Sequence, residues 1–191
     1  MPSSHAQRPW RLVVAASGLA GVVLAALQYD VWWTALSQLA SLAVAVGYLA
    51  LAVRPAPGTR ADDVVRGGLA VVMVLVALGF WSMQHGNGAD PYSLLEHGLT
   101  PALVLLDVTV VGRLGALRRT DPLRWLVAPA AYLTWYVAAD LGTYAALDPA
   151  RPVELVVRAA LLALLVLATG AALLLRSRPR RVVAVAVPVA A

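Results

Sequence analysis

The chain has 191 residues, of which 61% are hydrophobic and only 13% are charged, and its mean hydropathy is +0.77. A soluble domain carries about 25% charged residues, so this composition excludes a soluble globular enzyme, a disordered chain and a disulfide scaffold. The chain has no cysteine, which also excludes thiolate metal sites, iron–sulfur clusters and cysteine nucleophiles.

Six stretches are apolar and long enough to cross a bilayer, which requires about 20 helical residues. They are predicted at Leu12–Tyr29, Val31–Val53, Gly67–Ala89, Leu94–Gly112, Trp125–Leu147 and Val153–Leu175. Proline, glycine and charge separate them, as at Arg54–Arg60 and Asp148–Pro152, and proline ends helices because it lacks the amide donor. The predicted fold class is an all-α integral membrane protein, a single bundle of six transmembrane helices over residues 1–181. The apolar tail 182–191 is expected to be interfacial or disordered.

The arginines predict the orientation of the bundle. The formal charge is +5 and the chain has no lysine. If the N-terminus is cytoplasmic, thirteen of the fifteen arginines fall on that side, and only Arg151 and Arg158 fall on the other. Short loops with this bias determine topology by the positive-inside rule. We therefore expect both termini in the cytoplasm, and the basic charge requires no nucleic-acid partner.

Polar side chains form stripes within three of the predicted helices. The second helix carries Thr34, Ser37, Gln38 and Ser41; the fourth carries Glu96, His97, Thr100 and Asp107; the fifth carries Tyr132, Tyr136, Asp140 and Tyr144. Polar side chains at membrane depth usually face the bundle interior and often mark a site. Because Thr34, His97, Asp140 and Tyr144 fall in the outer half, we expect a polar cavity there. The inner half is expected to hold little that is polar besides loop arginines.

The same residues also allow a purely structural interpretation. A hydroxyl such as that of Thr34 often bonds a neighbouring helix for about 0.6 kcal/mol. Tyr144 fits an interfacial aromatic belt, and His85 fits a loop residue. Asp107 is harder to explain in this way, because an ionised carboxylate at mid-membrane costs about 2.5–3.5 kcal/mol. It must be protonated, paired or in contact with water.

Three segments resemble a known family of membrane proteins. They are Trp33–Leu39 (WTALSQL), Glu96–Asp107 (EHGLTPALVLLD) and Ala128–Tyr136 (APAAYLTWY). Their order and spacing are similar to those of the androgen-induced and androgen-dependent TFPI-regulating proteins and their bacterial six-helix relatives. The resemblance implies a multi-pass protein of the bacterial plasma membrane. It also implies an intramembrane hydrolase of fatty-acid esters of hydroxy fatty acids or similar acyl esters.

The family uses a threonine nucleophile and a histidine, and the matching positions here are Thr34 and His97. The chemistry is reasonable, because a neutral imidazole within about 2.6–3.2 Å can take the proton of a hydroxyl. Thr34 would then attack the ester carbonyl, and water would cleave the acyl-enzyme with His97 again as the base. The lipid ester would enter laterally, with its chains among leucine, valine and alanine side chains.

Four further residues are expected to support this reaction. The oxyanion requires hydrogen-bond donors, for which Gln38, Tyr136 or a free amide near the start of the second helix are candidates. A carboxylate could orient the imidazole, and Asp140 is preferred to Asp107 for this role. Spacing does not decide between the two.

Two other functions stay open at this stage. The same polar stripes could bind a lipid or small molecule without catalysis, or form part of a transporter. Metal-dependent hydrolysis by His85, His97 and acidic residues is the least favoured, because zinc sites need three or four ligands. We expect no cofactor and no metal, and the expected partners are a lipid ester and the membrane lipids.

Overall fold

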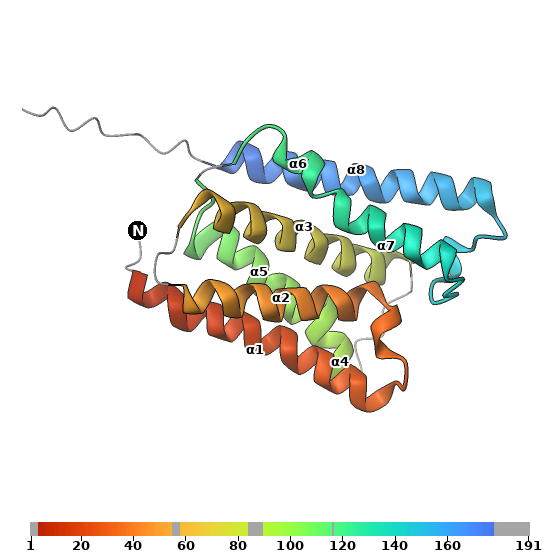
Figure 1. Cartoon of the computed structure of the whole chain (residues 1–191), viewed down its shortest axis with the longest axis horizontal. Coiled ribbons are helices and arrows are strands. Elements are labelled where there is room, and N and C mark those ends of the chain that lie inside the picture. Colours follow the sequence, from red (N-terminus) through yellow and green to blue (C-terminus); the bar gives the residue numbers. More distant parts are fainter. Residues whose placement is uncertain (1–3, 55–57, 84–89, 116, 178–191) are drawn as a thin grey trace, which may run out of the picture.

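The computed structural model is a bundle of long helices that lie roughly side by side (Figure 1). It describes residues 4–54, 58–83, 90–115 and 117–177. Four helices are continuous: α1 (Ser4–Gln28), α2 (Leu36–Val53), α3 (Arg60–Met83) and α8 (Pro152–Arg176). Together with Pro91–Val111, they make five segments of the described chain that are long and apolar enough to cross a membrane. The described part of the chain is all-helical, and these segments indicate a multi-pass membrane protein.

The segment Pro91–Val111 changes its helical winding three times. It consists of α4 (Pro91–Leu94), the π-helix η2 (Leu95–Leu99), α5 (Thr100–Leu106) and the π-helix η3 (Asp107–Val111). Pro101 has no N–H to donate to the His97 carbonyl, and the Trp81 indole donates to that carbonyl instead, at 3.2 Å. Single π-turns are frequent at functional sites, and His97 lies in the first of these two.

The predicted fifth span, 125–147, is not one helix. Two helices, α6 (Asp121–Arg124) and α7 (Val127–Ala138), are separated by a turn at residues 125–126. Pro129 explains the turn, because a proline ring clashes with the carbonyl four residues earlier, here that of Trp125. Asp140, with φ 48°, adopts the left-handed conformation after α7, and the short 3-10 helix η4 (Ala145–Leu147) follows.

The helices are arranged around α3, which contacts α2, α5 and α8. Figure 1 shows α1 and α2 on one side of it and α8 with α6 and α7 on the other. The start of α1 and the end of α8 lie at the same end of the bundle, which we call the terminal end. The opposite end, where α4 and the start of α8 lie, is the far end.

The terminal end contains buried charge, which corrects the expectation that this half is poor in polar groups. Three ion pairs join Arg54 to Asp62 (2.6 Å), Arg60 to Asp121 (2.7 Å) and Arg66 to Asp107 (2.7 Å). All three carboxylates are buried. The Tyr48 hydroxyl also donates to Asp107, at 2.9 Å. These pairs allow acidic residues to lie inside apolar helices, because each negative charge meets a guanidinium.

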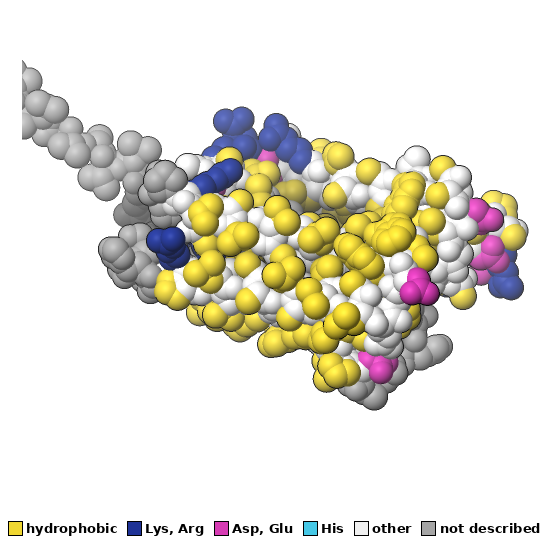
Figure 2. Space-filling view, turned by 60° about the horizontal axis from the view of Figure 1, so that its bottom comes forward, with side chains coloured by type: hydrophobic (Ala, Val, Ile, Leu, Met, Phe, Trp, Pro, Cys, Tyr) yellow, Lys and Arg dark blue, Asp and Glu magenta, His cyan; other side chains and the backbone are white. Residues whose placement is uncertain are grey.

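Exposed charge is also distributed unevenly between the two ends. Figure 2 shows hydrophobic side chains over the middle of the bundle and most of the visible arginines at the terminal end. Acidic side chains are visible toward the far end. The surface therefore has an apolar belt with basic groups on one side of it. The predicted tail, 182–191, lies outside the described residues.

Candidate functional site

An apolar cavity of about 400 Å³ lies in the half of the bundle toward the far end. Its walls come from the start of α2, the second half of α3, η2, α7, the segment 143–147 and α8. Most of the lining side chains are leucine, alanine and valine. The polar lining residues are Ser37, His97, Tyr132, Thr143 and Tyr144. An apolar cavity with a few polar groups is typical of a small-molecule site, and its walls suit a hydrocarbon chain.

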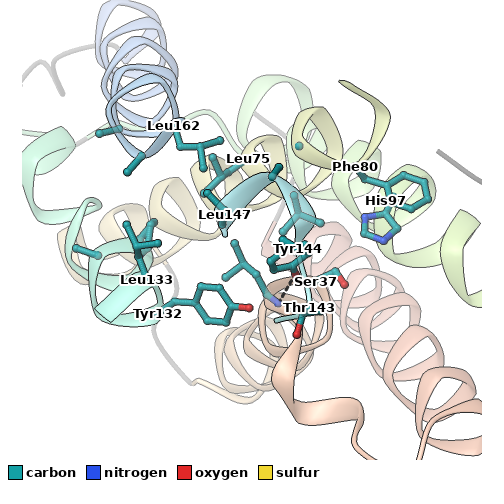
Figure 3. Close-up of a pocket in the computed structure, with 18 of the residues that line it drawn as sticks. Ser37, Leu75, Phe80, His97, Tyr132, Leu133, Thr143, Tyr144, Leu147 and Leu162 are labelled. Atoms are coloured by element: carbon teal, nitrogen blue, oxygen red, sulfur yellow. Dashed lines mark hydrogen bonds between the residues drawn. The ribbon is translucent and has the colours of Figure 1, made fainter. Parts of the chain in front are cut away.

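His97 is the basic group in this cavity (Figure 3). Its ring stacks on Phe80 with the centroids 3.7 Å apart and the planes at 2°. The next residue of α3 after Phe80, Trp81, donates a hydrogen bond from its indole to the His97 carbonyl. Helix α3 therefore holds both the side chain and the backbone of His97. The imidazole is buried, and its Nδ1 has no hydrogen-bond partner in the described part of the chain. The ring therefore has a buried nitrogen without a hydrogen-bond partner, in an apolar surrounding.

Thr34 lies in the 3-10 helix η1 (Trp32–Thr34) just before α2, also toward the far end. Its hydroxyl donates to the Val31 carbonyl at 3.2 Å. Among the described residues, no hydrogen bond joins it to His97, and the cavity lining includes Leu36 and Ser37 rather than Thr34. The structure thus brings both predicted residues to one part of the bundle but not into contact.

Two tyrosines hold the backbone next to Thr34. The Tyr132 hydroxyl donates to the Thr34 carbonyl at 2.8 Å, and the Leu36 amide donates to the Tyr144 hydroxyl at 2.8 Å. Because the first amides of a helix have no partner within the helix, Tyr144 caps α2 where Ala35 cannot. The stripe predicted on the fifth helix therefore positions the start of α2 against the cavity.

The other predicted residues have different surroundings. Tyr136 is fully buried, and its hydroxyl already bonds both the carbonyl and the amide of Tyr144, each at 3.1 Å. Asp140 is exposed and follows the end of α7. Asp107 bonds Tyr48 and Arg66, toward the terminal end. Neither aspartate hydrogen-bonds to the His97 imidazole in the described structure. Gln38 is buried, with its Oε1 unpartnered among the described residues.

Sequence reasoning did not select Glu96 as a site residue. Its side chain is 0% exposed, and neither carboxylate oxygen has a hydrogen-bond partner in the described ranges. The sequence feature that points to Glu96 is its position next to His97 near the start of a membrane helix, where a carboxylate is costly. A carboxylate there needs a proton, a partner or a ligand, so Glu96 belongs with the candidate site.

His85, the second histidine considered for a metal site, lies outside the described residues. The described chain has no group of three or more histidine, aspartate or glutamate side chains that could hold a metal ion. Comparisons with protein-family models, curated proteins and solved structures found no match. The family resemblance of the three segments therefore stays a prediction.

Proposed function

We propose that the chain is an intramembrane hydrolase of lipid esters, with Thr34 as the nucleophile and His97 as the general base. The observation that carries the proposal is the His97 imidazole, stacked on Phe80 with an unpartnered Nδ1, in the wall of an apolar cavity. The cavity would hold an acyl chain, with the ester group toward Ser37 and His97. Esters of long-chain fatty acids, including those of hydroxy fatty acids, fit these walls.

The reaction would proceed in two steps. The imidazole takes the Thr34 proton while Oγ1 bonds to the ester carbonyl carbon; the ester C–O bond breaks and the alcohol leaves with that proton. Water then cleaves the acyl-threonine with His97 again as the base, which releases the fatty acid. The Ser37 and Gln38 amides would support the oxyanion, because the first amides of a helix have no partner within it and the Leu36 amide is already bonded to Tyr144. For attack, the Thr34 hydroxyl must leave the Val31 carbonyl and turn toward the cavity.

A second candidate function is the binding of an amphiphile without cleavage. Two observations favour it. The Thr34 hydroxyl is bonded to the Val31 carbonyl, and the hydroxyl residue that lines the cavity at the start of α2 is Ser37. In this case Ser37, His97 and the cavity tyrosines would hold a polar head group. An acyl ligand would then bind saturably and remain intact.

The hydrolase is tested with purified protein in detergent and a long-chain acyl ester of a fluorescent phenol. We expect Thr34→Ala and His97→Ala each to lower the rate of hydrolysis by at least about 100-fold, because each removes one half of the nucleophile–base pair. Thr134→Ala is the matched control, because among the described residues its exposed hydroxyl bonds only the Ala130 carbonyl of its own helix. Full activity in both Thr34 and His97 variants would exclude this assignment.

A non-cleavable ether analogue of the substrate distinguishes binding without catalysis from hydrolysis. The wild type and Thr34→Ala should bind the ether equally if Thr34 acts only as the nucleophile. If the wild type binds the ether saturably but cleaves no ester, the second candidate holds.

We also propose that the chain crosses the bilayer six times, with both termini in the cytoplasm of a bacterial cell. Helices α6 and α7, together with the turn between them, span residues 121–138. At 1.5 Å per residue their combined length is about 27 Å, close to the roughly 30 Å of a hydrocarbon core. The arginines at the terminal end support a cytoplasmic location for that end.

This topology is tested by single cysteines, since the chain has none of its own. Thr120→Cys and Ala150→Cys are both at exposed positions, one on each side of the proposed fifth crossing. We expect a membrane-impermeant maleimide to label the cysteine at 150 in intact cells and the cysteine at 120 only after lysis. Equal labelling of both in intact cells would contradict the crossing, and the reverse pattern would invert the orientation.

A further inference from the structure

A group of buried oxygen atoms without partners lies on the first half of α2 and on α4 and η2, three elements that all pack against α1. Besides the two carboxylate oxygens of Glu96, the group contains Oε1 of Gln38 and the hydroxyls of Ser41 and Ser93. All four side chains are buried, and within the described part of the chain none of these atoms makes a hydrogen bond of normal geometry, although the Ser37 hydroxyl lies close to the Glu96 carboxyl. A buried polar group without a partner costs about 1–3 kcal/mol. Several in one place indicate that a ligand satisfies them.

Packing against two glycines of α1 brings Glu96 close to the part of α2 that carries Ser41. A Cβ at Gly21 would lie 3.0 Å from Cγ of Glu96, and a Cβ at Gly18 would lie 2.7 Å from the Ser41 carbonyl. Gly18 and Gly21 are one helical turn apart on one face of α1. Glu96 and Ser41 therefore lie within about one turn of each other along α1. Ser37, one turn from Ser41 on α2, lies next to the Glu96 carboxyl.

We propose that this group binds a sodium ion, with Glu96 as its charged ligand and Gln38, Ser41 and Ser93 as neutral oxygen ligands. Hard cations take oxygen ligands, and every unpartnered atom in the group is an oxygen. Glu96 supplies a single negative charge, which matches a monovalent ion. A divalent ion would retain a positive charge in a low-dielectric interior, where charge is expensive.

A proton on Glu96 explains the group less well than a cation does. The hydroxyls of Ser41 and Ser93 can donate as well as accept, yet in the described structure neither donates to Glu96 or to Oε1 of Gln38. One proton would change the Glu96 carboxyl alone, whereas a cation is attracted by carboxylate, amide and hydroxyl oxygens alike. The ion would link η2 to α2 and would thereby hold the helical turn that carries His97. The sodium proposal does not depend on the proposed hydrolase activity.

The test is the thermal unfolding of the purified full chain in detergent, followed by tryptophan fluorescence, with sodium replaced by choline at constant ionic strength. We expect saturating sodium to raise Tm by about 5 °C. Glu96→Gln should abolish the sodium effect. Glu154→Gln, the same change at the exposed second glutamate, should retain it. Ser93→Ala should raise the sodium concentration for a half-maximal shift about tenfold, because it removes one ligand.

Three results would overturn the proposal. They are an equal Tm of the wild type in sodium and in choline, a full sodium effect in Glu96→Gln, and stabilisation by lower pH with no response to sodium. The last of these would identify a proton as the ligand. Because Glu96→Gln could fail to fold, binding of radiolabelled sodium to the wild type is measured as well. We expect about one ion per chain, displaced by unlabelled sodium and not by choline.

Discussion

Replacing Asp107 by leucine is expected to destabilise the protein by about 3–5 kcal/mol, because it leaves Arg66 as a buried charge without its closest partner. Nε of Arg66 lies 2.7 Å from Oδ2 of Asp107, and both side chains are buried. Asp63 is a more distant partner, at 3.4 Å, and compensates only in part. The expected result is a large fall in Tm in detergent, measured by tryptophan fluorescence and by the fraction of protein that stays monodisperse after heating.

Two further variants test the cause of this effect. Asp148→Leu removes a more exposed partner of Arg151, 3.7 Å away, together with an exposed hydrogen bond from the Ala150 amide. It should cost far less than Asp107→Leu, because exposed ion pairs contribute about 0–1 kcal/mol. The double variant Arg66→Met, Asp107→Leu should recover much of the loss, since an apolar pair of similar volume can replace a buried ion pair. If Asp107→Leu alone is as stable as the wild type, the buried charge at the terminal end is not a stabilising element.

The hydrophobic runs predict the long helices well but not their ends. The hydrophobic pattern predicts that the third helix starts at Gly67, because charged residues precede it, yet α3 begins at Arg60. Asp62, Asp63 and Arg66 are buried within this helix. Their partners lie in other segments, since Gly115 donates to Asp63 at 3.0 Å and Asp107 is 41 residues from Arg66. Such pairs are set by tertiary contacts, which the local pattern does not contain.

The sequence predicts only part of the candidate site, again because the local pattern does not contain tertiary contacts. Stripe positions follow from helical periodicity, so the inward-facing residues Ser37, His97 and Tyr132 could be identified from the sequence. The sequence does not identify which helices are neighbours. The stacking of His97 on Phe80 and the distance of Asp107 from the cavity depend on that arrangement. Pro129 did carry a local signal for the broken fifth helix, but an apolar run of that length favours one continuous span.

Replacing Gly18 by alanine is expected to cost about 1–3 kcal/mol, the usual range for an overpacked contact. The new Cβ would lie 2.7 Å from the backbone carbonyl of Ser41 and 3.2 Å from the Ala45 amide nitrogen. These are backbone atoms of α2, so they can yield only if α1 and α2 move apart. Small residues at a crossing allow membrane helices to approach closely, and Gly18 does so between α1 and α2. The measurement is again the change in Tm in detergent.

Gly79→Ala is the matched control for this prediction, because a Cβ at Gly79 meets no heavy atom within 4 Å. Alanine is the better helix former by about 1 kcal/mol, so this variant should be as stable as the wild type or more stable. The same substitution is thus expected to change stability in opposite directions at two glycines. Equal stabilisation at both would mean that α1 and α2 are not in close contact at Gly18, and the packing that places Ser41 beside Glu96 would then be wrong.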